Sequence, residues 1–79
     1  NISINIYPNP SAEHITISVD GLNLEEYSVR LVNATGMNVY AGHFKDQLDL
    51  TSLPAGIYSL VLENAEVVMI KQIVVHYSG

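Results

Sequence analysis

The side chains in this 79-residue chain that could bind a metal or transfer protons are three histidines and eight carboxylates. His14, His43 and His76 lie in different segments, and no two of them have a metal-motif spacing such as His-x-x-x-His. Asp46 and Asp49 are close together, but their surroundings do not resemble a calcium-binding EF-hand loop. We therefore interpret the histidines as surface or strand-end residues and the aspartates as solvated turn residues. The sequence predicts no metal site and no cofactor.

The sequence also gives no support for nucleophilic catalysis. The chain has no cysteine, and none of its seven serines lies in a Gly-x-Ser-x-Gly elbow. Asn33-Ala34-Thr35 fits a glycosylation sequon, but the same residues suit an ordinary turn, which is the interpretation that we favour. The sequence predicts no catalytic residues, and we expect a protein that is not an enzyme.

The charge of the chain excludes two classes of partner. Its formal net charge is -5, because only Arg30, Lys45 and Lys71 oppose the eight carboxylates. An acidic surface is repelled by the phosphate backbone and by anionic lipid, so we expect neither a nucleic acid nor an anionic membrane surface as a partner. No apolar run approaches the roughly 18–20 residues of a membrane-spanning helix, and we predict no membrane span.

Short stretches of alternating apolar and polar residues dominate the chain and are separated by turn signals. The alternation predicts strands over residues 2–6, 14–19, 27–32, 37–41, 47–50, 57–63 and 67–75. Such spacing, with no segment that favours a long helix, is typical of a small all-β domain. We predict an antiparallel two-sheet sandwich of the Ig-like kind with about seven strands, and a barrel is the alternative.

The segment from Leu53 to the end of the last strand organises the rest of the chain. Residues 57–63 and 67–75 read as a hairpin closed by the polar residues 64–66. Gly56 and Gly36 are expected to take a positive φ, which a residue with a side chain rarely adopts. Both faces of residues 67–75 are largely apolar, which predicts a strand well inside a sheet or under a cover.

Residues 1–79 are expected to form a single domain, since the sequence contains no internal repeat and no linker. The chain starts within a strand pattern and without Met. We therefore expect a terminal module cut from a larger secreted protein.

Four motifs, in order along residues 4–75, resemble the C-terminal sorting domains of the Bacteroidetes type IX (Por) secretion system, type A. The first is Tyr7-Pro8-Asn9-Pro10, which closes the first strand. Residues 33–39 are similar to the family's hairpin turn, and residues 48–60 contain its Leu-x-x-Gly-x-Tyr segment. Residues 71–75 resemble its closing Lys-x-Ile-Val-Val strand. The tail of residues 76–79 extends beyond the family's usual end.

The resemblance implies a non-catalytic domain that type IX machinery recognises. Such a domain follows a cargo domain in its parent chain, passes through the periplasm, and directs the cargo across the outer membrane to the cell surface or the medium. The implied partners are the type IX translocon and a sortase-like peptidase that cleaves before the domain. The alternative is an Ig-like spacer, or an adhesion or carbohydrate-binding accessory module, of a secreted enzyme. The candidate recognition residues are Tyr7, Pro8, Asn9, Pro10, Gly36, Leu53, Gly56, Tyr58, Lys71, Ile73, Val74 and Val75.

Overall fold

A computed structural model of the chain describes residues 4–7 and 13–76. Within them are seven strands and no helix. The strands are β1 (Ile4–Tyr7), β2 (His14–Val19), β3 (Ser28–Val32), β4 (Asn38–His43), β5 (Gln47–Asp49), β6 (Gly56–Glu63) and β7 (Val68–Val75). The predicted all-β class and the number of strands are confirmed.

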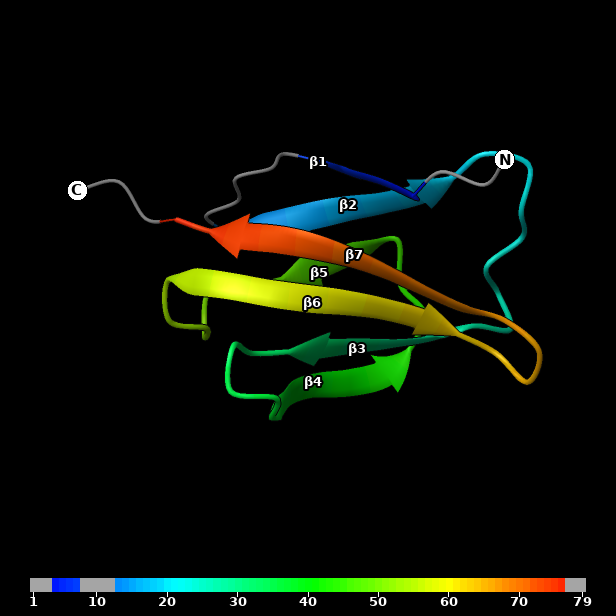
Figure 1. Cartoon of the computed structure of the whole chain (residues 1–79). Coiled ribbons are helices and arrows are strands. Elements are labelled where there is room, and N and C mark those ends of the chain that lie inside the picture. Colours follow the sequence, from blue (N-terminus) through cyan, green and yellow to red (C-terminus); the bar gives the residue numbers. More distant parts are fainter. Residues whose placement is uncertain (1–3, 8–12, 77–79) are drawn as a thin grey trace.

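The strands form two sheets that pack face to face (Figure 1). One sheet has the order β1-β2-β5 and the other has the order β4-β3-β6-β7, and every neighbouring pair is antiparallel. The two separate sheets make the fold a sandwich and not a barrel, as the short alternating segments predicted.

The core lies between the sheets and is made by the alternating residues of five strands. The alternation also placed Ile4 and Ile6 of β1 inward, and these two side chains are only partly buried against the core. In the five strands that make the core, the inward side chains are buried and none of them is more than 7% exposed. They include Ile15, Ile17, Val19, Val29, Leu31, Leu48, Tyr58, Leu60, Leu62, Ile73 and Val75. Leu24 and Tyr27 close the core at one end, where the connection between β2 and β3 crosses it. Burial of apolar area on this scale is the main stabilising contribution in so small a domain.

The prediction for the last strand was wrong in one respect. β7 has β6 on one side and no other strand of the described residues on the other, so it lies at the edge of its sheet. Val68 and Ile70, on its outer face, are 59% and 64% exposed. The two apolar faces of β7 therefore have different surroundings: one packs in the core, and the other lies on the surface. An apolar run specifies burial only where another layer covers it.

Smaller differences concern where elements begin and end. The fourth strand runs from Asn38 to His43, whereas residues 37–41 were predicted, and Met37 lies exposed in the preceding turn. The pairing of β3 with β4 shifts between Leu31 and Val32, which accommodates this later start. β5 ends at Asp49, although the next residue, Leu50, is still fully buried.

Candidate functional site

The motifs that lie far apart in the sequence meet at one end of the sandwich, which we call the motif end. β1 ends there at Tyr7, and β6 begins there at Gly56, whose pairing partner is Val75 near the end of β7. The turn of residues 33–36 follows β3 at the same end, on the left in Figure 1. This convergence makes the motif end the candidate functional site.

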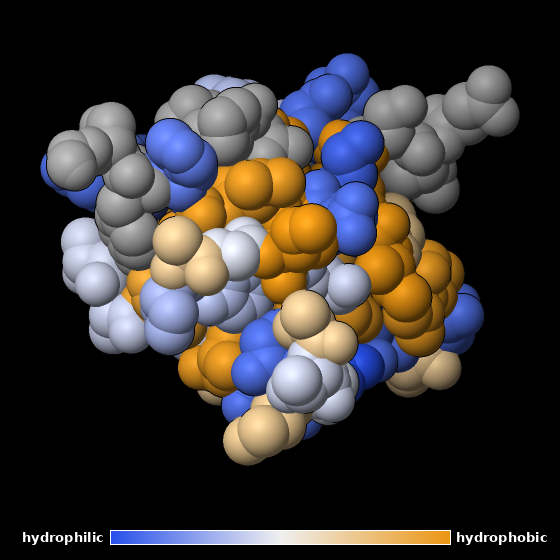
Figure 2. Space-filling view, turned by 60° about the vertical axis from the view of Figure 1, so that its left-hand side comes forward, coloured by the Kyte–Doolittle hydropathy of each residue, from blue (hydrophilic) through white to orange (hydrophobic). Residues whose placement is uncertain are grey.

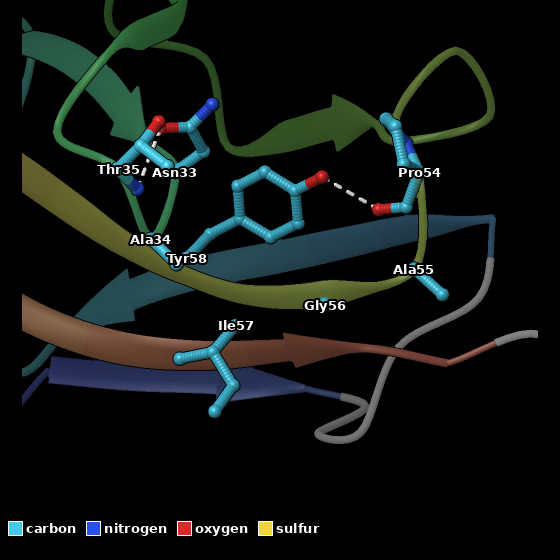
Figure 3. Close-up of a pocket in the computed structure, with 8 residues that line it drawn as sticks. All are labelled: Asn33, Ala34, Thr35, Pro54, Ala55, Gly56, Ile57 and Tyr58. Carbon is cyan, nitrogen blue, oxygen red and sulfur yellow. Dashed lines mark hydrogen bonds between the residues drawn. The ribbon is translucent and has the colours of Figure 1, made fainter.

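Tyr58 fixes the loop that enters β6. Its ring is buried, and its hydroxyl donates a 2.5 Å hydrogen bond to the backbone carbonyl of Pro54 (Figure 3). Between them, Gly56 has a φ of 157°. The positive sign of this angle agrees with the prediction from the sequence. Leu53 is half-buried against the core. The Leu-x-x-Gly-x-Tyr segment is thus a tied loop, comparable to the tyrosine corner of other sandwiches, in which a Tyr hydroxyl binds nearby backbone.

The facing turn is fixed by one amide oxygen and by two backbone hydrogen bonds, in which the N–H of Asn33 donates to Met37 at 2.9 Å and the N–H of Gly36 donates to Asn33 at 3.0 Å. Oδ1 of Asn33 accepts hydrogen bonds from the backbone N–H of Thr35 at 3.1 Å, the Thr35 hydroxyl at 2.8 Å and the N–H of Met37 at 2.9 Å. Gly36 completes the turn with a φ of 90°, which confirms the expected positive value. These contacts use Asn33 and Thr35 as turn residues, in agreement with our interpretation of the sequon.

The two loops enclose a hollow of about 220 Å³. Its walls come from the turn after β3 and from the start of β6, and Figure 3 shows the two groups facing each other. The lining residues are Asn33, Ala34, Thr35, Pro54, Ala55, Gly56, Ile57 and Tyr58. None of them carries a carboxylate, an imidazole or an amine, and the hydroxyls of Thr35 and Tyr58 are engaged within their own loops. The hollow offers shape and apolar surface, and it lacks the nucleophile–base pairing that catalysis needs.

Hydrophobic and weakly polar side chains gather on the surface that Figure 2 brings forward, with hydrophilic residues interspersed among them. At the motif end Tyr7, Met37 and Ile57 are each at least half exposed. The opposite end differs in chemistry, since a hollow of about 450 Å³ there is lined by Glu26, Asn64, Ala65 and Glu66. The two ends therefore present different surfaces to a partner.

The closing Lys-x-Ile-Val-Val segment divides between core and surface. Ile73 and Val75 are buried, whereas Lys71 and Val74 are exposed. Among the other candidate residues, Tyr58 is buried, and Tyr7, Gly36 and Gly56 are exposed. Pro8, Asn9 and Pro10 lie outside the described residues. The candidates that a partner can contact are thus the exposed ones, and the buried ones hold the surface in place.

Asp49 is the last residue of β5, and its carboxylate is bound within the turn that follows. Oδ1 of Asp49 accepts hydrogen bonds from the Thr51 hydroxyl at 2.7 Å and the Thr51 N–H at 2.9 Å. These bonds, the hydroxyl first, lower the pKa of Asp49, and His14 opposite it on β2 adds a small effect in the same direction. In the described part of the chain, no three His, Asp or Glu side chains are grouped so as to hold a metal ion.

Four turns share a hydrogen bond that was not predicted from the sequence. Asn23, Asn33, Asp49 and Asn64 each accept a hydrogen bond from the backbone N–H two residues further on. The signal was present, because Asn and Asp favour this turn geometry. Of the residues that line the hollow, Gly56 and Tyr58 were predicted as recognition candidates. The others lie within the same two motif segments but were not predicted as candidates: Asn33, Ala34, Thr35, Pro54, Ala55 and Ile57.

Comparison with known proteins identifies the family. The model of the "Secretion system C-terminal sorting domain" family matches residues 5–76. A solved structure of PorZ, an essential bacterial surface component of the type-IX secretion system of human oral-microbiomic Porphyromonas gingivalis, contains a similar fold, with a TM-score of 0.73 at 18% identity. The similarity covers 95% of this chain and 12% of that one, so the chain corresponds to a small part of the PorZ structure. No curated protein matches the sequence significantly. None of the described residues form a helix long and apolar enough to cross a membrane.

Proposed function

Since the chain belongs to the family of type IX secretion C-terminal sorting domains, we propose that it is a non-catalytic signal that directs a preceding cargo protein across the outer membrane to the cell surface or the medium. The observation that supports this proposal best is the family match over residues 5–76, with the matched motifs meeting at one end of the fold. The motif end is then the surface that the type IX machinery contacts.

The geometry suits a surface that is recognised in its folded form. A protein partner that must accept one signal on many cargoes needs a surface whose shape does not vary. The hydrogen bond of Tyr58 and the three hydrogen bonds to Oδ1 of Asn33 restrain the loops of the motif end. The hollow between these loops remains open to a partner.

The path of the chain also agrees with this role. β1 begins at Ile4, which pairs with Val19 at the end of β2, and this is the end of the sandwich opposite the motif end (Figure 1). A cargo domain attached before Ile4 would therefore leave the motif end uncovered. In this proposal the domain follows its cargo in the parent chain and passes through the periplasm, and a sortase-like peptidase cleaves between the two.

A fusion experiment tests the proposal. A reporter that reaches the periplasm by its own leader is joined in front of residues 1–79 and expressed in a bacterium with a type IX system. We expect the reporter at the cell surface or in the medium, and we expect it to stay in the periplasm of a strain that lacks the translocon. A periplasmic reporter in both strains, from a fusion whose domain is folded, would reject the sorting role in favour of an Ig-like spacer.

A further inference from the structure

The edge of β7 is the longest regular edge among the described strands, and the four-residue strand β1 of the other sheet contacts part of β7. Each sheet has two edge strands, and three of these four are short or irregular: β5 has three residues, β1 has four described residues, and β4 has a register shift in its pairing with β3. β7 is a regular strand of eight residues that pairs with β6 over its whole length. A long regular edge with apolar side chains is a template for a further strand.

Lys71 is the one charged residue of β7. It lies on the core-facing side of β7, opposite the fully buried Leu60, but its own side chain is exposed. β1 and β7 are the edge strands of their sheets on this side of the sandwich and contact each other, and Lys71 lies near the middle of β7. Lys71 has no ion pair among the described residues, whereas Arg30 pairs with Glu63 at 2.8 Å.

The charge of this edge is opposite to that of the molecule. The chain has a net charge of -5, yet Lys71 is the single charged side chain in β1 and β7. A second copy of β7 that pairs antiparallel near the centre of the strand would bring two Lys71 side chains together, which is unfavourable. A strand that carries a carboxylate opposite Lys71 would instead form a cross-strand charge pair.

We propose that the β7 edge, between Val68 and Gln72, binds an extended segment of a partner protein by strand addition. The segment presents a Glu or Asp to Lys71, and it presents apolar side chains on the other face, where they continue the exposed row of Val68 and Ile70. Backbone hydrogen bonds provide the affinity, and the carboxylate selects the partner. This inference goes beyond the sorting role. It is tested by the binding of peptides to the purified chain and does not depend on whether the domain directs export.

Synthetic peptides test the proposal on the purified 79-residue chain. The first probe is a short peptide in which valine alternates with threonine and the central threonine is replaced by glutamate. The second has lysine at that position, and a third has the glutamate and N-methylated backbone nitrogens that cannot donate. We expect the glutamate peptide to slow hydrogen exchange of amides within residues 68–72 and to bind about threefold more tightly than the lysine peptide. The N-methylated peptide should not bind.

Charge reversal supplies the control. Lys71→Glu should reverse the preference, so that the lysine peptide binds more tightly, while the amide spectrum of the other strands stays unchanged. Lys45→Glu reverses a cation outside β7 and should leave the preference for glutamate intact. Equal binding of both peptides to the unmodified chain, protection outside β7, or an equal effect of Lys45→Glu would overturn the proposal. Concentration-dependent protection of the same amides without any peptide would assign the edge to a second copy instead.

Discussion

The hydroxyl of Tyr58 donates a 2.5 Å hydrogen bond to the backbone carbonyl of Pro54, four residues earlier in the chain. This bond joins the core to the loop of the motif end, since the Tyr58 ring is buried and Pro54 is exposed. The Gly and the Tyr of the family segment therefore serve one purpose, because Gly56 gives the chain the backbone conformation that lets the hydroxyl reach Pro54.

Tyr58→Phe should lower the free energy of unfolding by about 1 kcal/mol, the usual contribution of one hydrogen bond, because the ring remains in the core. Tyr27→Phe is the matched control, since Tyr27 is equally buried but its hydroxyl has no hydrogen bond to the described residues. Chemical denaturation of both variants measures the difference. An equal loss in the two variants would show that the bond to Pro54 contributes nothing.

Gly36→Ala should destabilise the domain by about 1–2 kcal/mol because its φ of 90° is costly for a residue with a side chain. Gly56→Ala should also cost more than about 1 kcal/mol. Space is not the cause, since a Cβ at Gly36 would meet no atom within 4 Å and one at Gly56 would lie 4.0 Å from the Tyr58 ring. Thermal denaturation, with Ser52→Ala as a turn control expected to change stability by less than about 0.5 kcal/mol, checks both. Unchanged midpoints for the glycine variants would contradict the backbone explanation.

Substitutions at neighbouring positions of the closing Lys-x-Ile-Val-Val segment should lower the free energy of unfolding by different amounts. Ile73 is fully buried and Val74 is 38% exposed. Ile73→Val removes one buried methyl group and should cost about 0.5–1.5 kcal/mol. Val74→Ala removes two methyl groups from a position that solvent already reaches and should cost less. If Val74→Ala were the more destabilising change in urea denaturation, our division of this motif into core and surface would be incorrect.

The hydrogen bonds to Asp49 make the stability of the fold depend on pH in the acid range. Its pKa in the folded chain is lowered by the Thr51 hydroxyl and N–H. A lowered carboxyl pKa stabilises the fold at pH values above the ordinary value of 3.8, and this stabilisation is lost as the pH falls through the lower folded-state pKa. Thr51→Val removes the hydroxyl and should move the pKa of Asp49 up towards its ordinary value. An NMR titration of the Asp49 carboxyl carbon measures the change, and an unaltered pKa would mean that the hydroxyl is not the main cause.

Much of the fold could be predicted because successive residues of a sandwich strand face the core and the solvent in turn, so that apolar and polar residue types alternate along it. Ile15, Ile17 and Val19 are buried on one face of β2, and the polar residues between them lie on the other. The exposed outer face of β7 could not be predicted in this way, because Val68 and Ile70 have the same residue types as core positions. Whether such residues are covered depends on the order of the strands in the sheets, which the sequence does not state locally.

The candidate site was predictable as a set of motifs and not as a surface. Gly36, Gly56 and Tyr58 follow from turn chemistry and from the family pattern. Their meeting at one end depends on the pairing of β3 with β6 and of β6 with β7. The partner of Tyr58 is a backbone carbonyl, which every residue has, so no residue type indicated it.

We propose that the type IX machinery recognises the motif end of the folded domain. Ala55→Glu places a charged side chain at the rim of the hollow, and Ala65→Glu makes the same change in an exposed turn at the opposite end. Because both sites are exposed turn positions, each variant should stay folded, which denaturation of the purified chains verifies. The decisive measurement is the fraction of a fused reporter that reaches the surface or medium of a type IX-competent host. We predict that Ala55→Glu lowers this fraction at least severalfold while Ala65→Glu leaves it at the level of the unmodified domain. Equal export of the two variants, or a loss confined to Ala65→Glu, would contradict the account.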